Sequence, residues 1–421
     1  MNTKDSRLME HEKIEALRNL ALTLNSVSDL DLMMETILSE ARRFVGAQAG
    51  SIYINEGERL ILTYSQNDFF KKQTGRLPYK DQELALTANS LAGYAARSNR
   101  LLNIADAYNI PSESPFRFHP DFDRRTGYVT RSILTIPLTD IRKSVTGVLQ
   151  IINRLDAEGR ATSFTSEDEE LMLLFSSTAA MALERAQLIR QMLLRTVKMA
   201  ELRDPRETTP HARRVGAMAG ELYEIWARRQ RLDDDEMKRN LDHLRIAAML
   251  HDIGKVGVPD LILTKPGRLT TEERREMEKH VLIGLKLFQP IASELDTVIR
   301  ETIMGHHERW DGLGYPGWVD PDTGAPLPDH PELHGRPQGK KGEENSIFGR
   351  VTAVADVFDA LSSRRVYKDA FDDALVARIM EQERGHHFDP DLVDILLDNQ
   401  GKIHDIRNRF PESMDECQPS A

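Results

Sequence analysis

Two short stretches decide how the second half of this 421-residue sequence is interpreted: HDIGK at residues 251–255 and HHERWDGLGYP at residues 306–316. His251 and Asp252 end the apolar helical run of residues 246–250. An imidazole and a carboxylate that are adjacent at the end of a helix can reach two neighbouring metal ions, with the carboxylate bridging them. The pattern therefore favours a metal site carried by helices.

Three further histidines and one aspartate extend this pattern. His280 lies inside a helical pattern, and His306 and His307 close another helix. Asp356 lies in the apolar helix of residues 351–361, where burial of an unpaired carboxylate would be costly and a metal ion would remove that cost. Each residue by itself is more often a surface or hydrogen-bonded residue than a ligand. Their combination in this order is poorly explained by chance.

The complete pattern resembles the HD-GYP family of cyclic di-GMP phosphodiesterases, a branch of the HD hydrolase superfamily. The resemblance covers about residues 196–405 and implies an all-α, HD-type catalytic domain, with residues 406–421 as a polar C-terminal tail. It implies a site for two or three divalent transition metal ions. The ligands that it implies are Glu207, His211, His251, Asp252, His280, His306, His307 and Asp356. Because this set offers only nitrogen and oxygen, iron is favoured and manganese comes next, ahead of a closed tetrahedral zinc site.

Glu207 and His211 decide between two metal ions and three. They match the positions that complete the site in family members with three metals. Thr209 and Pro210 have the residue types of a helix N-cap and of the first helical position. That assignment places His211 in the first turn and Glu207 just before it, so that both side chains can point into one site. The alternative for Glu207 is a solvated carboxylate.

The resemblance also implies the residues that act on a substrate. Asp252 and Lys255 are the expected catalytic residues. Lys255, one helical turn after His251, would hydrogen-bond a phosphate oxygen or protonate the departing ribose oxygen. The alternative is a surface lysine, which is favourable after a helix C-terminus in any case. The expected substrate-binding residues are Lys255, Gly314, Tyr315, Pro316, Arg365 and Lys368.

Two features depart from the family pattern. Val366 stands where the family usually has proline, a change that would loosen the turn but leave the two neighbouring cations in place. The irregular stretch of residues 317–342 is longer than the family's usual connection and is rich in Pro, Gly, Asp and His. We expect it to form a long loop, with His330 and His334 in solvent rather than on a metal.

The first 190 residues mix helix and strand signals. Apolar residues at helical spacing are followed by runs rich in Ile, Val, Leu and Thr. Ser166–Glu169 has the composition of a capping box that opens a long helix. This order predicts an antiparallel sheet covered by helices. The strand-like runs are residues 51–55, 59–64, 132–139 and 145–152.

This segment resembles a GAF domain over about residues 15–190, and we assign residues 1–190 to a GAF-like sensory domain. The resemblance is to the Asn-Lys…Phe-x-x-x-Asp-Glu signature of cyclic-nucleotide-binding GAF domains. The matching residues are Asn153, Arg154, Phe164, Asp168 and Glu169. The resemblance implies a small-molecule or cyclic-nucleotide ligand. The alternative is that these residues serve the fold, with Phe164 packed and the acids favourable at a helix N-terminus.

A helix without Gly or Pro, residues 184–203, is predicted to connect the two halves. Its apolar stripe suits a parallel homodimer, although the stripe could also pack on its own domain. The stripe comprises Leu188, Ile189, Met192, Leu193 and Val197. In a dimer, the GAF-like domain would regulate the catalytic half through this helix.

Composition limits the other possibilities. The formal net charge of -11, without a basic stripe, argues against a nucleic-acid partner. The single cysteine, Cys417, excludes an intrachain disulfide and a thiolate metal site. Since no stretch resembles a signal peptide or a membrane span, we expect a cytoplasmic protein with no membrane segment.

The sequence thus predicts a metal-dependent phosphodiesterase that hydrolyses cyclic di-GMP to linear pGpG, with GMP as a further product. Two alternatives stay open. One is a related HD hydrolase that acts on another cyclic dinucleotide. The other is a cyclic di-GMP receptor with little turnover, which would be expected to lose metal ligands or the lysine.

Overall fold

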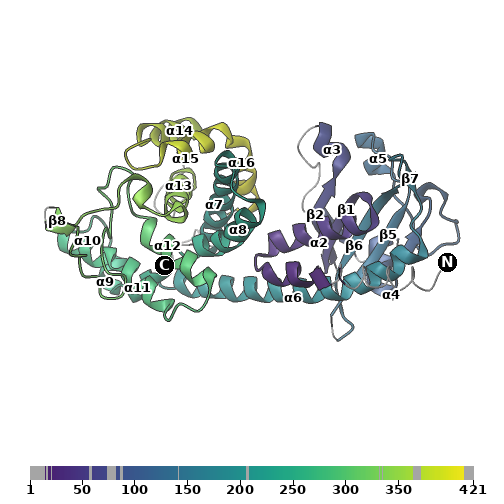
Figure 1. Ribbon diagram of the computed structural model, residues 1–421, viewed down its shortest axis with the longest axis horizontal. Coiled ribbons are helices and arrows are strands. Elements are labelled where there is room, and N and C mark those ends of the chain that lie inside the picture. Colours follow the sequence, from purple (N-terminus) through teal and green to yellow (C-terminus); the bar gives the residue numbers. More distant parts are fainter. Residues whose placement is uncertain are drawn as a thin grey trace. The chain divides into compact units, whose positions relative to one another are not determined.

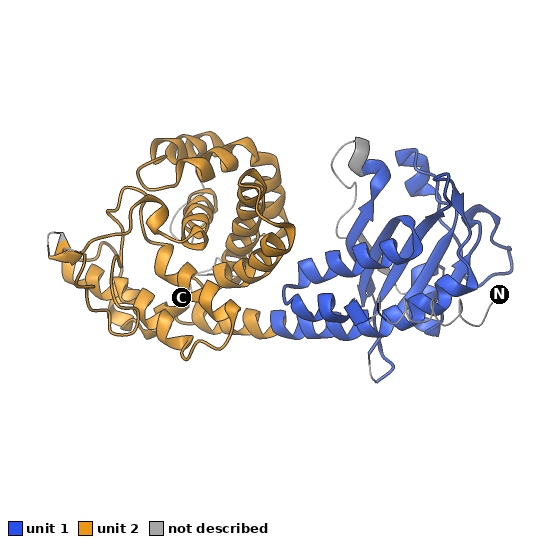
Figure 2. Cartoon of the chain, in the orientation of Figure 1, with its two compact units in different colours: residues 1–190 blue, residues 191–421 orange. Residues whose placement is uncertain are grey.

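The computed structural model describes residues 15, 18–19, 21–55, 59–73, 82–85, 89–140, 142–204, 208–330, 332–333, 335–363 and 371–411. The chain divides into two compact units, Met1–Arg190 and Gln191–Ala421 (Figure 1, Figure 2). No helix in the described part of the chain is long and apolar enough to cross a membrane.

An antiparallel sheet forms the centre of the first unit, as predicted. Its strands lie in the order β3-β2-β1-β6-β5-β4, and β7 pairs with β6. Each of these pairings is antiparallel. The strands are β1 (Ala47–Asn55), β2 (Arg59–Asn67), β3 (Gln82–Ala85), β4 (Leu102–Ile104), β5 (Ile133–Thr139), β6 (Val145–Leu155) and β7 (Ala161–Thr162).

Helices pack on this sheet and bury its apolar side chains. The main core lies between α2, α6 and one sheet face, where Ile37, Ile52 and Phe175 are fully buried. Burial of this apolar surface is what holds the helices to the sheet. The helical segments are α2 (Leu30–Val45), α3 (Asp68–Gln73), α4 (Leu91–Ser98), the 3-10 turn η1 (Ala107–Asn109), α5 (Asp121–Thr126) and α6 (Ser166–Glu201).

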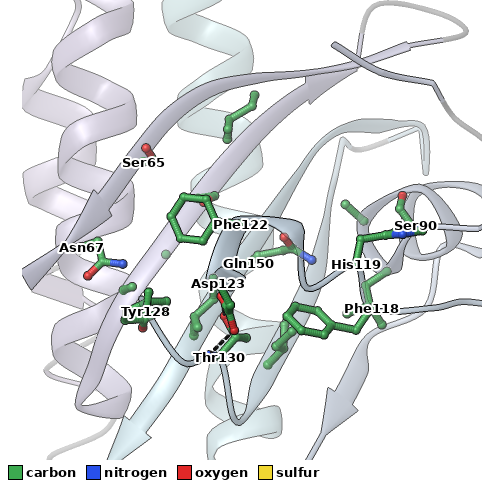
Figure 3. Close-up of a pocket in the computed structure, with 18 of the residues that line it drawn as sticks. Ser65, Asn67, Ser90, Phe118, His119, Phe122, Asp123, Tyr128, Thr130 and Gln150 are labelled. Atoms are coloured by element: carbon green, nitrogen blue, oxygen red, sulfur yellow. Dashed lines mark hydrogen bonds between the residues drawn. The ribbon is translucent and has the colours of Figure 1, made fainter. Parts of the chain in front are cut away.

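The opposite face of the sheet borders a cavity of about 260 Å³ (Figure 3). Successive strand residues point to opposite faces, so Gln150 of β6 lines the cavity while its neighbours Leu149 and Ile151 lie in the main core. One corner is aromatic. The rings of Phe70, Phe122 and Tyr128 have centroids 5.8, 6.1 and 6.2 Å apart.

Asp123 is the buried acid of this cavity. Its carboxylate accepts hydrogen bonds from the backbone N–H of Thr130 at 2.7 Å, the Thr130 hydroxyl at 2.9 Å and the Tyr108 hydroxyl at 2.9 Å. The protein itself therefore supplies three donors to this carboxylate.

The N-terminus of α6 differs from the predicted capping box by one residue. Thr165, not Ser166, caps the helix: its hydroxyl accepts the backbone N–H of Asp168 at 3.1 Å, and the Asp168 carboxylate accepts the Thr165 backbone N–H at 2.7 Å. The two residues satisfy each other's backbone donors across the first turn. The prediction placed the capping box on residues 166–169, whereas the pair that forms it is Thr165 and Asp168.

The second unit is almost wholly helical, as predicted. α7 packs on α8 and α13, and α12 packs on the same two helices. The helical segments are α7 (Thr209–Arg229), α8 (Asp234–Met249), η2 (Ile253–Gly257), α9 (Asp260–Leu263), α10 (Thr271–Glu278), α11 (His280–Leu287), α12 (Glu294–Gly305), η3 (Gly342–Glu344), α13 (Ile347–Ser362), α14 (Asp373–Gln382), α15 (Pro390–Asp398) and α16 (Gln400–Arg409).

Three local predictions need correction. Thr208 caps α7, since its hydroxyl accepts the His211 backbone N–H, so Thr209 is the first helical residue rather than the cap. The helical pattern around His280 is two helices, α10 and α11, that meet at Lys279. The stretch of residues 317–342 is not wholly irregular, because β8 (Glu332–Leu333) and β9 (Arg336–Pro337) form a short hairpin in it.

Candidate metal centre

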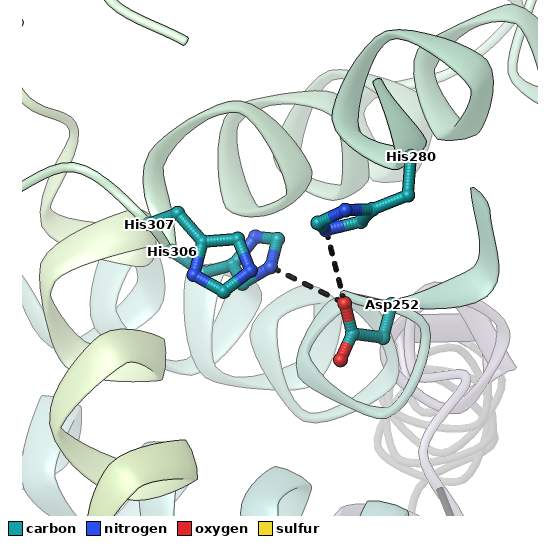
Figure 4. Close-up of side chains that lie close together, drawn as sticks. All are labelled: Asp252, His280, His306 and His307. Carbon is teal, nitrogen blue, oxygen red and sulfur yellow. Dashed lines mark ion pairs between the residues drawn. The ribbon is translucent and has the colours of Figure 1, made fainter. Parts of the chain in front are cut away.

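Seven of the eight predicted metal ligands lie in the described part of the chain, and the fold brings them together in two clusters. Within each cluster the candidate ligand atoms lie within 4.8 Å of one another, so each could hold a metal ion. The first cluster, drawn in Figure 4, comprises Asp252, His280, His306 and His307. The second comprises His211, His251 and Asp356.

Helix ends and one close helix crossing produce this convergence. His251 and Asp252 follow α8, His280 begins α11, and His306 ends α12. α12 and α13 approach closely at glycines: a Cβ on Gly349 would lie 2.6 Å from the Cα of Gly305. Only residues without side chains permit this approach, which brings the end of α12 against the helix that carries Asp356.

Asp252 joins the two clusters. Its Oδ1 lies 3.1 Å from Nε2 of His280 and 3.5 Å from Nε2 of His306, both in the first cluster. Its Oδ2 lies 3.3 Å from Nε2 of His251, in the second cluster. The two oxygens of one carboxylate therefore face different clusters, which is the arrangement of a bridging ligand.

Local hydrogen bonds orient three of the imidazoles in the same way. Nδ1 of His251, His280 and His306 lies 2.8, 2.9 and 2.8 Å from the carbonyl oxygen of the residue three positions earlier. A carbonyl only accepts, so each Nδ1 carries the hydrogen and each Nε2 keeps its lone pair for the site. Such a fixed tautomer is typical of histidines that bind metals.

Several inward-facing atoms of the centre make no hydrogen bond to the protein. Within the described residues, Nε2 of His280, Nε2 of His306 and Oδ1 of Asp252 are buried and make no hydrogen bond. Buried polar atoms are rarely left in this condition unless an ion or water satisfies them. Imidazole nitrogens and carboxylate oxygens fit a divalent transition metal, so the residues present suit the group that the sequence implies.

Electrostatics favour the metal-binding protonation states. Burial by itself would raise the pKa of Asp252, but Lys255 and His251 outweigh it and hold the pKa well below its usual range. Burial lowers the pKa of His306, and burial together with the neighbouring imidazoles lowers that of His307 further. An ionised carboxylate and neutral imidazoles are the forms that ligate metals.

Two further residues of this centre were not found in the sequence. Nδ1 of His211 donates to Oδ2 of Asp359 at 2.8 Å, and Arg214 donates to both oxygens of the same carboxylate at 2.6 and 2.9 Å. Burial raises the pKa of Asp359, but these donors prevail and lower it to about 2. The available signal was spacing: Asp359 follows Asp356 by three residues in an apolar helix, on the same face.

Lys255 lies beside the bridging carboxylate. Its Nζ is 2.7 Å from Oδ2 of Asp252 and 4.0 Å from Oδ2 of Asp204. The turn η2 that carries it is packed hard against α11, because a Cβ on Gly254 would collide with the carbonyl oxygen of His280. Lys255 thus lies at the metal centre, next to the carboxylate that joins the two clusters.

The Gly-Tyr-Pro stretch also lies against the centre. The ring of Tyr315 stacks on that of His307, with centroids 4.6 Å apart and planes at 24°. A Cβ on Gly314 would collide with the backbone of Glu308 and Arg309, so the tight turn needs glycine. Burial raises the pKa of Tyr315, which keeps its hydroxyl protonated and able to donate. Pro316 follows this tyrosine directly.

Comparison with known families agrees with both units. A model of the HD domain matches residues 209–361, a second HD-domain model matches residues 331–392, and a model of the GAF domain matches residues 29–183. The chain carries a GAF domain and an HD domain. The resemblances found in the sequence are thereby confirmed at the level of these two domains.

Curated relatives align with roughly half to two thirds of this chain. A probable cyclic di-GMP phosphodiesterase of Vibrio cholerae is 38% identical over 51% of this chain and 45% of its own length. A 3'3'-cGAMP-specific phosphodiesterase 2 of Vibrio cholerae is 35% identical over 49% of this chain and 34% of its own length. A cyclic di-GMP phosphodiesterase of Thermotoga maritima is 32% identical over 64% of each chain. The chain spans less than two thirds of the length of each of these relatives.

Glu308 anchors the long loop of the HD domain. Its two carboxylate oxygens accept the backbone N–H groups of Gly317 at 2.6 Å and Lys340 at 3.0 Å, which closes the loop at both ends. Burial raises the pKa of Glu308 to about 7, in spite of these two donors. His330 stacks on Trp318 inside the loop, with centroids 4.0 Å apart.

Some predicted site residues fall outside the part of the chain that the structure describes. These are Glu207, Arg365 and Lys368. His334 of the long loop, which was expected in solvent, also lies outside the described residues.

In the GAF domain, the closing signature serves the fold. Asn153 accepts the Arg131 backbone N–H at 2.7 Å and donates to the Val129 carbonyl at 2.8 Å. Arg154 pairs with Asp168 at 2.9 Å. Among the described residues, none of the five signature residues lines the cavity. These contacts support the second interpretation of the signature, in which it holds the fold together.

Proposed function

We propose that the HD domain is a metal-dependent phosphodiesterase that hydrolyses cyclic di-GMP to linear pGpG, with GMP as a further product. The observation that carries the proposal is the position of Asp252, whose two oxygens face two clusters of imidazole and carboxylate ligands. Two adjacent metal sites are typical of enzymes that catalyse displacement at phosphorus. The names of the relatives supply the substrate class.

The proposed ligands are the eight residues implied by the sequence. His280, His306 and His307 with Asp252 would hold one ion, and His211, His251 and Asp356 would hold the second, with Asp252 shared. Glu207 would add a ligand for a third. When bound, the ions would activate water and stabilise charge on the phosphoryl oxygens. The nitrogen and oxygen donors favour iron, then manganese.

The chain's own side chains would orient the substrate and control protons. Lys255 holds an ammonium beside the bridging carboxylate, where it can bind a phosphate oxygen or give a proton to the departing ribose oxygen. The hydroxyl of Tyr315, beside Gly314 and Pro316, can donate to the nucleotide. Arg365 and Lys368 would bind the second phosphate.

A second candidate substrate is 3'3'-cGAMP. One relative of similar identity is named for that dinucleotide, and both molecules present the same phosphodiester ring. The ligands of the metal centre suit a phosphodiester, which the two substrates share. They therefore do not distinguish the guanine of one substrate from the adenine of the other. A cyclic di-GMP receptor without turnover is the remaining alternative, against which the intact ligand set and Lys255 argue.

The GAF domain would regulate this activity in a cytoplasmic homodimer, with a small molecule, a cyclic nucleotide first, as its ligand. Support for dimerisation comes from α6. Leu174, Met181 and Leu188 recur every seven residues and are 58, 50 and 49% exposed, the repeat of a coiled-coil seam. Val197, part of the stripe predicted from sequence, is buried instead.

The deciding experiment is turnover by the full-length protein, purified under anaerobic conditions and loaded with iron or manganese. Cyclic di-GMP and 3'3'-cGAMP are supplied separately, and linear products are quantified with time. We expect cleavage of cyclic di-GMP to pGpG that stops on chelation. Tight binding of cyclic di-GMP without any product would instead establish the receptor, and exclusive cleavage of 3'3'-cGAMP would establish the second candidate.

A further inference from the structure

The end of α6 and the residues just after it contact two segments of the metal centre. Glu201 ends the helix, and Arg203 and Asp204 come after Leu202, beyond its end. We call these three residues the α6 clamp. Glu201 and Asp204 are buried charged residues, so their carboxylates require partners that offset the free-energy cost of removing a charge from water.

Glu201 holds the start of α7. Its Oε2 accepts the backbone N–H of Thr209 at 3.1 Å and the Thr209 hydroxyl at 2.7 Å. A carboxylate at a helix N-terminus also interacts favourably with the helix dipole. His211, a candidate metal ligand, lies two residues further along α7, in the same helical turn. The position of Glu201 therefore affects the position of the backbone that carries the His211 imidazole.

Arg203 and Asp204 hold η2 from the other side. One guanidinium nitrogen of Arg203 donates to the carbonyl of Val258, which ends η2, at 3.1 Å and to Asp260 at 2.6 Å. The Asp204 carboxylate lies 4.0 Å from Nζ of Lys255. Because Lys255 is also 2.7 Å from Asp252, its ammonium sits between two carboxylates.

The turn η2 has little freedom to absorb a displacement of the clamp. On the side of α11, Gly254 is already in contact with the backbone of His280. A movement of Arg203 and Asp204 must therefore be passed to Lys255 rather than taken up by slack packing. The lysine side chain is a flexible four-carbon stem. The two carboxylates restrict the positions that its ammonium group can take.

We propose that the α6 clamp is a positioning element, through which the end of α6 sets the place of Lys255 and of the first turn of α7 at the metal centre. The inference rests on the proposed function of the HD domain and adds the point at which α6 acts on it. Asp204 works through Lys255, and Glu201 works through the α7 segment that carries His211. A change in α6 shifts turnover by as much as it favours one clamp position over another.

The first test needs no turnover. Amide hydrogen exchange is measured on the full-length, metal-loaded protein and on Glu201→Ala, Arg203→Ala and Asp204→Asn. We expect exchange of residues 253–258 to accelerate roughly tenfold in the Arg203 variant, as for loss of one charge-assisted hydrogen bond. The Asp204 variant loses an ion pair at 4.0 Å and should show a smaller acceleration of the same residues. In Glu201→Ala the acceleration should fall on residues 209–213. Unchanged exchange in both segments overturns the proposal.

The control variant is Arg229→Ala. It removes an exposed ion pair between Arg229 and Asp398, 3.3 Å apart, in the same unit. It should leave exchange of both segments at the wild-type rate. Equal acceleration in the control would show general loosening of the unit and would also overturn the clamp.

The second test separates positioning of Lys255 from a merely structural role. Asp204→Asn should lower kcat roughly tenfold with KM and metal content nearly unchanged, but by less than twofold when Lys255 is already replaced by alanine, since coupled residues are not additive. The same loss in both backgrounds overturns the proposal while leaving the phosphodiesterase intact. If the wild-type protein cleaves no cyclic dinucleotide, the proposed function fails, and the exchange measurement alone decides the clamp.

Discussion

The metal centre of the HD domain and the cavity of the GAF domain both contain buried polar groups, but these groups are satisfied in different ways. In the metal centre, buried nitrogens of His280 and His306 and one oxygen of Asp252 make no hydrogen bond within the described residues. In the GAF cavity, the carboxylate of Asp123 accepts three hydrogen bonds from the protein. The first interior offers lone pairs that a metal ion can accept, whereas the protein itself satisfies the carboxylate of the second.

This difference explains why the two sites are unequally informative. A buried nitrogen or oxygen that has a lone pair and makes no hydrogen bond indicates the class of group that it can bind, here a Lewis acid that accepts lone pairs. A carboxylate whose hydrogen bonds all come from the protein, as for Asp123, indicates a role in the fold and does not identify a ligand. The HD domain thus specifies its cofactor class, whereas the GAF domain leaves the identity of a ligand open.

The strongest way to break the comparison is to remove the residue that joins the two metal clusters. Asp252→Ala should lower turnover by roughly three orders of magnitude, since bridged metal ions contribute several kcal/mol to charge stabilisation. Metal analysis should show losses from both clusters. Asp398→Ala, an exposed acid of the same unit, is the matched control. Retention of full metal content by Asp252→Ala would show that the carboxylate does not bridge.

Removal of metal tests the two interiors against each other. Chelation should destabilise the HD domain by about 3–4 kcal/mol for an ion held at roughly 100 to 1,000 times its dissociation constant. The GAF domain should keep its stability. Unfolding followed by hydrogen exchange in separate peptides of each unit measures both. Equal destabilisation of the two units would contradict the distinction drawn between them.

Replacing the lysine beside the bridge separates charge from metal binding. Lys255→Ala should leave metal content unchanged and lower turnover by roughly 10²-fold, as for loss of one preorganised group that stabilises developing charge. Lys286→Ala, an exposed lysine on α11, should behave like the wild type. If Lys255→Ala loses metal as Asp252→Ala does, the lysine supports the ligands rather than the substrate.

The GAF cavity allows the smallest and most local test. Asp123→Ala leaves the backbone N–H of Thr130 without its acceptor, which should cost the GAF domain about 1–3 kcal/mol. Metal content of the HD domain should not change. Asp121→Ala, an exposed acid two residues earlier, is the control and should be neutral. A stability loss in both variants would mean that helix α5 as a whole, not the buried carboxylate, determines the stability.

Much of the centre could be predicted because its ligands are marked by residue type. Histidine and aspartate at the ends of apolar helices are chemically conspicuous, and His251, His280 and His306 obtain their tautomers from carbonyls only three residues away. The sheet of the GAF domain was predictable for a similar reason, since runs rich in Ile, Val, Leu and Thr, such as residues 145–152, are a local property of the sequence.

Two of the errors lie where a helix boundary depends on one side chain. Thr165 and Thr208 each act as the cap where an adjacent hydroxyl residue had been expected to do so. In both places two hydroxyl residues stand side by side, and composition cannot distinguish them. The choice is made by which hydroxyl reaches the backbone N–H three residues ahead.

The sequence by itself determined the two domains, the metal-binding character of the second and most of its candidate ligands, because side-chain chemistry and short-range periodicity are local. Only the tertiary structure decided the partners that reach those ligands from distant segments. Asp359 orients His211 from 148 residues away, and Asp204 reaches Lys255 from another segment. Such pairs depend on where helices cross, as at Gly305 and Gly349, and helix crossings arise from packing of the whole domain.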